Sequence, residues 1–262
     1  MKWLFVILSG LSLTSCISYP LMHYAVAQNV PLLTQQNEAR LSASTGTEII
    51  GLQGAWAFSK SFAVMGSYSI GLFEFEKSGF ISDYSFNNGM RSSGELAIGY
   101  FDPIDENGVF EIYTGFERFY RSYSETQFPT GVQYTYKLST GGSKPFVQFD
   151  LGFHNTDYHN FCLSFRMGIF SYDHFLYQVS DSGKTINIQT TNFNLTPSLI
   201  IEPCITYRLG MKNLCFQVQA GFSYVNQIGN GIPISNSVTD QFFFNVGLTY
   251  KLFPNWKARN SR

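Results

Sequence analysis

One place in the sequence carries adjacent side chains that could perform hydrolysis. Asp173 and His174 are neighbours, and Ser171 lies shortly before them. A histidine oriented by a carboxylate can act as a general base, and a nearby hydroxyl can act as a nucleophile. A lone histidine is more often a hydrogen-bonding group at an interface than a catalytic base. We expect His154 and His159 in a turn at the opposite end of the fold, where they could not meet this pair. The sequence therefore predicts no enzyme, and a hydrolase built on Asp173 and His174 stays as an alternative.

The cysteines favour lipid attachment over metal binding. The chain has 4 cysteines and 4 histidines, but no Cys-x-x-Cys pair or Cys/His cluster, so we expect no metal and no cofactor. Cys16 ends the string Leu-Thr-Ser-Cys after a short apolar stretch, which has the form of a bacterial lipobox with cleavage before an acylated cysteine. Ordinary cleavage after residues 25–27 is the alternative. We expect Cys162, Cys204 and Cys215 to be small buried side chains, and at least one to be free because their number is odd.

The composition points to a membrane protein that crosses with strands. Aromatic residues make up 17% of the 262 residues and charged residues only 13%, against about 25% charged in soluble domains. Mean hydropathy is −0.04, and no apolar run of about 20 residues follows the N-terminal stretch, as a membrane helix would need. A net charge of −1 gives no basic surface for nucleic acid. Transmembrane β-barrels have this balance because lipid-facing and lumen-facing residues alternate.

Period-2 alternation divides the chain into segments of the length of barrel strands. In the segment 195–209, for example, Ile201, Ile205 and Tyr207 alternate with Glu202 and Cys204. Such alternation between turn-rich pieces is typical of transmembrane strands. We predict ten strands, at residues 37–45, 48–58, 62–73, 93–101, 109–119, 145–153, 161–172, 195–209, 214–224 and 241–252.

The lengths of the connections supply an independent indication. Long loops are expected at residues 74–92, 120–144, 173–194 and 225–240, and short turns at the other end. Barrels with both termini in the periplasm have short periplasmic turns and longer external loops. A soluble β-sandwich or lipocalin-like barrel is the alternative, but its exposed face would carry many more charged residues.

Charged residues of both signs are expected on the lumen face of these strands. Because unpaired enclosed charges are costly, we expect them to form a packed ionic core that fills the lumen. A polar conduit or a binding pocket is the functional alternative, although a barrel of about ten strands is only slightly wider than the eight-stranded barrels that side chains fill. The predicted lumen network consists of Arg40, Glu95, Glu111, Glu117, Asp150, Arg166, Glu202 and Arg208, with Lys251 beside it.

Several short strings resemble a family of small outer-membrane β-barrel lipoproteins of the Bacteroidetes lineage. The similarity extends over most of the chain after the N-terminal stretch, and it implies location and architecture more than activity. The strings are Gln28–Leu33 before Glu38–Arg40, Gly54–Phe58 through Phe62–Met65, Phe146–Gln148, Ser164–Arg166, and Glu202–Pro203 followed by Arg208–Gly210.

These observations predict an all-β, antiparallel, up-and-down transmembrane barrel with its lumen filled by side chains. We assign residues 1–15 to a signal peptide, 16–36 to a lipidated periplasmic linker, 37–253 to the barrel and 254–262 to a periplasmic tail. The expected protein is a non-enzymatic lipoprotein of the bacterial outer membrane, a structural or accessory subunit of a complex. Its expected partners are outer-membrane lipid and other outer-membrane proteins bound through aromatic-rich external loops. The alternatives are a barrel hydrolase acting on outer-leaflet lipid or peptide, and a narrow channel for small solutes.

Overall fold

The structure is a computed structural model. It describes residues 26–46, 49–78, 84–104, 108–127, 134–156, 159–181, 184–186, 197–211, 213–227 and 241–252. The predicted signal peptide, the lipidation site Cys16 and the predicted tail 254–262 lie outside the described residues.

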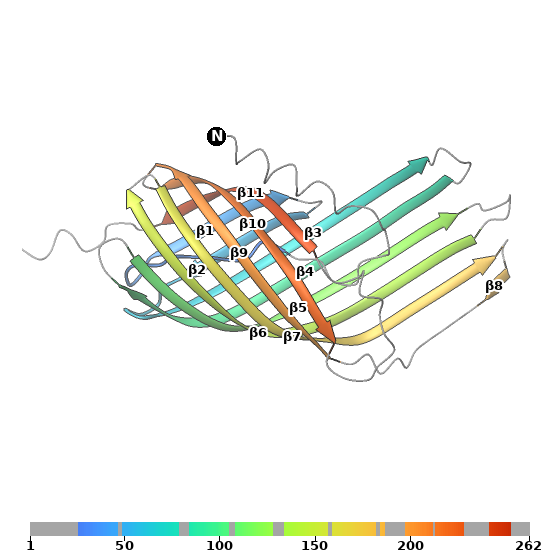
Figure 1. Cartoon of the computed structure of the whole chain (residues 1–262), viewed down its shortest axis with the longest axis horizontal. Coiled ribbons are helices and arrows are strands. Elements are labelled where there is room, and N and C mark those ends of the chain that lie inside the picture. The colour runs from blue at the N-terminus through green and yellow to red at the C-terminus, as the bar shows by residue number, and fades with distance from the viewer. Residues whose placement is uncertain are drawn as a thin grey trace, which may run out of the picture.

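The described chain forms a closed antiparallel barrel of ten strands with one short additional strand (Figure 1). Neighbouring strands pair in sequence order, β7 pairs with β9, and β1 pairs with β11 to close the sheet. Closure matters because an unpaired strand edge is not tolerated in hydrocarbon. The strands are β1 (Ala39–Gly46), β2 (Ile49–Trp56), β3 (Phe62–Ser78), β4 (Tyr84–Pro103), β5 (Gly108–Gln127), β6 (Tyr134–Thr156), β7 (His159–Asp181), β8 (Lys184–Ile186), β9 (Ser198–Gly210), β10 (Leu214–Gln227) and β11 (Gln241–Leu252).

The alternation in the sequence becomes an apolar exterior and a polar interior. Along β9, burial alternates from one residue to the next, with Cys204 3% exposed and Ile205 49% exposed. Among the described residues, Leu96 on β4 is the most exposed large apolar side chain, at 76%. This arrangement is inside-out relative to a soluble barrel, and it is the arrangement that a lipid environment requires. No helix among the described residues is long and apolar enough to cross a membrane.

Most of the residues expected in long loops belong to strands instead. Strands β3 to β7 continue for 17 to 23 residues, and β4 and β5 stay paired from Ser85 to Pro103. The expected loops 74–92 and 120–144 are therefore largely strand, as is the start of 173–194. Beyond the membrane both faces of a strand can meet water, so the apolar period disappears while the backbone pairing continues. Figure 1 shows these strands projecting beyond β1, β2 and β9 to β11 at one end of the barrel.

The two ends of the barrel differ. We call the end where β1 begins and β11 finishes the turn end; the β2–β3, β4–β5, β6–β7 and β9–β10 connections lie there, each only a few residues long. At the opposite end, which we call the loop end, the β10–β11 connection spans residues 228–240. Short turns at the end where the first strand begins and the last strand finishes are the arrangement expected for a periplasmic face.

Residues 26–36, which we call the lumen segment, run inside the barrel. Gln28, Val30 and Leu32 are each 1% exposed and Leu33 is fully buried. The segment was expected to be part of a periplasmic linker, and its described portion is instead enclosed by the strands. Space for it comes from small inward side chains on β2, β3 and β4, such as Ala55, Ala63 and Ala97, in a barrel wider than the eight-stranded barrels whose own side chains fill them.

Candidate functional site

All eight residues predicted to form the lumen network lie inside the barrel. Each is at most 6% exposed, although the barrel wall carries them on six different strands. The structure adds buried charged residues that the sequence pattern did not indicate. The predicted set is Arg40 on β1, Glu95 on β4, Glu111 and Glu117 on β5, Asp150 on β6, Arg166 on β7, and Glu202 and Arg208 on β9; the additions are Glu38, Arg91, Arg121 and Lys144.

Arg166 occupies the centre of one part of the network. Its guanidinium forms an ion pair with Glu95, at 2.9 Å between Nη1 and Oε2. The same guanidinium donates to Gln148 Oε1 at 2.6 and 2.8 Å and lies 4.4 Å from the centre of the Phe146 ring. Arg166 on β7 is therefore bonded to Glu95 on β4 and to Gln148 on β6. These contacts link the three strands inside the barrel.

Lys144 on β6 bridges two carboxylates from β5 and β9, the strands on either side of the β6–β7 pair. Its Nζ lies 2.7 Å from Glu117 Oε2 on β5 and 3.0 Å from Glu202 Oε2 on β9. Ser223 on β10 donates a further hydrogen bond to Glu202 Oε1 at 3.4 Å. A buried ammonium between two carboxylates is compensated on both sides, which is the condition under which enclosed charges are tolerated.

Side-chain amides bind the backbone of the lumen segment in its first half. The backbone N–H of Gln28 donates to Gln219 Oε1 at 2.8 Å, and Gln219 Nε2 donates back to Gln28 O at 3.0 Å. Gln53 Nε2 donates to Ala27 O at 2.8 Å, and Gln148 Nε2 donates to Asn29 O at 2.7 Å. These amides therefore take the place of a neighbouring strand, since they supply both donors and acceptors to an extended chain.

The side chains of the segment are recognised as well. Gln28 Nε2 donates to the carbonyl oxygen of Glu202 at 2.7 Å, and its Oε1 accepts from Ser164 Oγ at 2.6 Å. Asn29 Nδ2 donates to the carbonyl oxygens of Gly54 and Gly66 at 2.9 and 3.1 Å. Two polar side chains are thus satisfied deep in the barrel, where an unpaired amide would be costly.

Charged side chains hold the second half. The backbone N–H groups of Leu32 and Leu33 both donate to the carboxylate of Glu111, at 2.9 and 2.7 Å. Leu32 has φ of 54°, a left-handed conformation that turns successive N–H groups toward one anion. Arg40 Nη2 donates to Leu32 O at 2.7 Å, and Arg208 donates to Val30 O. The strain of a left-handed leucine is offset by two hydrogen bonds to the carboxyl group of Glu111.

Apolar contacts also hold the lumen segment in place. Leu33 packs in a cluster with Ala57, Ala63 and Phe101 near the turn end. Leu32 faces Gly152 on β6, where an added Cβ would lie 2.6 Å from Leu32 Cδ2. Gly152 therefore provides room that another residue would remove.

Glu38 connects the segment to the start of the barrel. Its carboxylate pairs with Arg40 at 2.9 Å and with Lys251 at 3.1 Å, and it accepts from the N–H and hydroxyl of Thr34 at 3.0 and 2.9 Å. Burial alone would raise the pKa of Glu38, but the two cations and the hydrogen bonds outweigh it and lower that pKa to about 2. Glu38 is therefore ionised at neutral pH and fixes the turn between the segment and β1.

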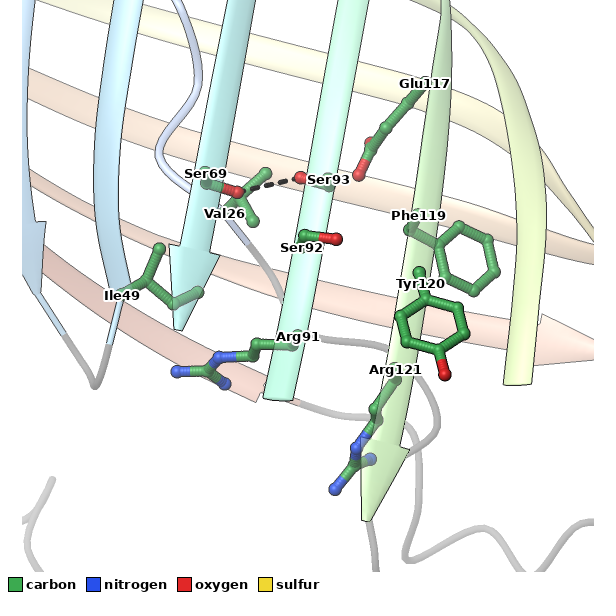
Figure 2. Close-up of a pocket in the computed structure, with 10 residues that line it drawn as sticks. All are labelled: Val26, Ile49, Ser69, Arg91, Ser92, Ser93, Glu117, Phe119, Tyr120 and Arg121. Atoms are coloured by element: carbon green, nitrogen blue, oxygen red, sulfur yellow. Dashed lines mark hydrogen bonds between the residues drawn. The ribbon is translucent and has the colours of Figure 1, made fainter. Parts of the chain in front are cut away.

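A small recess lies between the segment and the loop end (Figure 2). Val26 and Ile49 line it together with Ser69, whose hydroxyl is 2.8 Å from that of Ser93. Figure 2 shows Arg91 and Arg121 on neighbouring strands at the loop-end side of the recess, away from Glu117. The two arginines are directly opposite in the β4–β5 register. The recess is of about 30 Å³, which is enough for a water molecule or two and too small for an organic substrate.

The hydrolase alternative rests on Asp173 and His174 at the external rim, and the structure describes the side chain of only one of the two. Asp173 is exposed and pairs with Arg118, with 2.5 Å between Oδ2 and Nη1, and the side chain of His174 lies outside the described residues. His159 is at the turn end, where its Nδ1 is 2.7 Å from the Tyr207 hydroxyl.

Cys162, Cys204 and Cys215 are buried free thiols, as expected for small core side chains. Among the described residues, no group of histidine, cysteine and acidic side chains could hold a metal ion.

Solved structures with a similar strand arrangement are outer-membrane proteins. The outer membrane protease OmpT from Escherichia coli is 9% identical with a TM-score of 0.47, covering 82% of this chain and 93% of that one. The translocator domain of the autotransporter NalP from Neisseria meningitidis is 10% identical with a TM-score of 0.43, covering 81% and 86%. CarO from Acinetobacter baumannii is 9% identical with a TM-score of 0.36, covering 84% and 97%. No protein-family model and no curated protein matches the sequence.

Proposed function

We propose that the protein is a lipoprotein of the bacterial outer membrane whose barrel is closed by its own N-terminal segment, and that it acts as a non-enzymatic structural or accessory subunit. The observation that carries this proposal is the lumen segment itself. Its backbone is held by side chains from six strands, among them Gln53, Glu111, Gln148 and Gln219. The bound segment occupies the lumen, which supports a closed barrel. The apolar exterior supports contact with lipid.

Ion conduction is the property that tests the closed lumen. An ion passing through would have to displace the segment or pass through the ion pairs of Arg166 and Lys144. We expect the purified folded protein to show baseline conductance in a planar lipid bilayer. A steady conductance with ohmic behaviour would reject the closed barrel and favour the narrow solute channel.

The accessory role is tested by what the protein binds. Gentle detergent extraction of the outer membrane, followed by capture of a tagged copy, should recover a partner in stoichiometric amount. A tagged copy with Tyr120→Ser is captured in parallel. It tests whether an exposed aromatic side chain toward the loop end binds the partner. Recovery of the protein alone would reject the accessory role and give weight to the hydrolase, for which His174→Ala should then abolish an outer-leaflet activity in folded protein.

Lipid attachment is tested separately at Cys16. We expect Cys16→Ala to abolish incorporation of a labelled fatty acid while the barrel still folds, because the thiol is the proposed acylation site. Persistent labelling of this variant would show that acylation does not occur at Cys16.

A further inference from the structure

A hollow on the outer, apolar surface of the barrel follows a row of outward side chains across the sheet. Phe165 on β7 is directly opposite Pro203 on β9, and Phe222 on β10 is directly opposite Phe242 on β11. The hollow has a volume of about 710 Å³, which is within the range of sites that bind small molecules. We call it the outer groove, and its central side chains are Phe165, Pro203, Ile205, Ala220, Phe222 and Phe242.

Two small side chains form the floor of the outer groove. The other described outward side chains of β9 and β10 are leucine, isoleucine, valine, phenylalanine or tyrosine. Pro203 and Ala220 break these two series, and Ala220 is opposite Ile205 in the β9–β10 register. The larger neighbours therefore rise on both sides of the two small residues and leave a concave surface.

Pro203 also interrupts the pairing of β9 with β10. The register includes Gly221 opposite Cys204 and resumes at Tyr224 opposite Ile201, with no paired residues between them. Proline has no N–H group to donate to a neighbouring strand, and a missing backbone hydrogen bond is costly in hydrocarbon. Departures of this kind from the local rules of a strand concentrate at functional positions, so the floor of the outer groove is a candidate for one.

The chemistry and the length of the outer groove indicate what it holds. Its central side chains carry no charge and no hydrogen-bonding group, whereas a protein interface carries about one hydrogen bond per 100–200 Å². A row across five strands, from Phe149 on β6 to Phe242 on β11, is about 19 Å long at the usual spacing of strands. One leaflet of a hydrocarbon core of about 30 Å is about 15 Å deep. The outer groove therefore suits a single flexible hydrocarbon chain better than a protein surface.

The outer groove runs obliquely away from the turn end. Phe110, which lines it, lies two residues after the start of β5, whereas Phe242 lies ten residues before the finish of β11. We propose that the outer groove binds one acyl chain of a phospholipid of the periplasmic leaflet, with the headgroup beside the start of β5. This proposal rests on the proposed function, because it takes the exterior as facing lipid and the turn end as the periplasmic face.

Photocrosslinking with a phospholipid that carries a diazirine on one acyl chain tests the occupant. The folded protein is reconstituted into phosphatidylcholine vesicles that contain a small fraction of this lipid, and mass spectrometry locates the crosslinked peptides. We expect the crosslinks to be concentrated on the peptides that contain Pro203 and Ala220. Ala220→Phe should fill the floor of the outer groove and lose this concentration. Ala43→Phe, the same change at an exposed position of β1, should retain it.

The distribution of crosslinks in the unaltered protein decides the proposal without any variant. Crosslinks spread evenly over the outward faces of the strands would overturn the acyl-chain site and leave the barrel in lipid. The same concentration in Ala220→Phe, with the variant shown to be folded by its heat resistance on gels, would also overturn the site. Crosslinks on no strand at all would reject the lipid-facing exterior, and with it the proposed function.

The position of the headgroup is tested with a second phospholipid, which carries the diazirine on its headgroup. We expect this lipid to crosslink near Phe110, at the turn end. Crosslinks confined to the loop end would overturn the assignment to the periplasmic leaflet.

Discussion

Replacing Glu111 with alanine should release the lumen segment from the barrel wall. The carboxylate accepts the backbone N–H groups of Leu32 and Leu33 at 2.9 and 2.7 Å, and no alanine atom can replace it. A buried N–H group left without its acceptor costs about 1–3 kcal/mol, so the loss of both hydrogen bonds costs about 2–6 kcal/mol. At about 1.4 kcal/mol for each factor of ten, the released population should rise roughly 30- to 10⁴-fold.

Hydrogen exchange with mass spectrometry measures this release directly. Backbone amides exchange in proportion to the population of the open form, so the peptide covering residues 27–34 should exchange faster by the same factor in Glu111→Ala. Glu111→Gln keeps one acceptor and should give an intermediate rate. Asp102→Asn removes an exposed carboxylate at the end of β4 and should leave the rate unchanged. Unaltered exchange in Glu111→Ala, with the strands still protected, would refute the claim that this carboxylate anchors the segment.

Three further perturbations follow from the same structure. Gly152→Ala should speed exchange of the segment, since its Cβ would lie 2.6 Å from Leu32 Cδ2, and adding Leu32→Ala should restore slower exchange; additive effects would contradict the contact. Glu38, with a pKa lowered to about 2, contributes its stabilisation above pH 4.5 and loses it as pH falls toward 2, an effect of about 3 kcal/mol. Between pH 4.5 and pH 2, the heat resistance of the folded barrel on gels should fall in the unaltered protein and should not fall in Glu38→Gln. The same pH dependence in both proteins would count against the pairing. Leu96→Arg places a charge on the most exposed apolar side chain of the described residues and should destabilise the barrel by about 2–4 kcal/mol in urea unfolding. The control Leu96→Ala should have a small effect. Equal effects of the two substitutions would mean that this face does not meet lipid.

The sequence alone was sufficient for the barrel and for eight of its inward charged residues. In β9 the alternation of Ile205 and Tyr207 with Cys204, Thr206 and Arg208 matches the burial seen in the structure, because a strand with lipid on one face must separate apolar from polar side chains. The extensions of β3 to β7 were mistaken for loops because that requirement ends at the membrane surface, while backbone pairing does not.

The lumen segment could not be recognised from local pattern. It forms no ladder with a strand, so it has no period, and its partners are distant in sequence; Gln219 lies 191 residues from Gln28. One signal was present. The run Val30–Leu33 is apolar and contains Pro31, which is unusual for a solvated linker and compatible with an extended chain that is bound through its carbonyl groups. A pairing between Gln28 and Gln219 nevertheless depends on the closed barrel and becomes visible only in three dimensions.

The turn that joins the lumen segment to β1 makes the segment a tethered ligand. Only the residues around Asn37 separate the bound chain from the first strand, and a short tether of this kind gives an effective concentration on the order of millimolar. A free peptide of equal intrinsic affinity at about 1 µM would therefore occupy the lumen only about once in a thousand barrels. Soluble peptides in the surrounding compartment are thus weak competitors, and opening the barrel requires a force or a partner that acts on the tether or on its anchors.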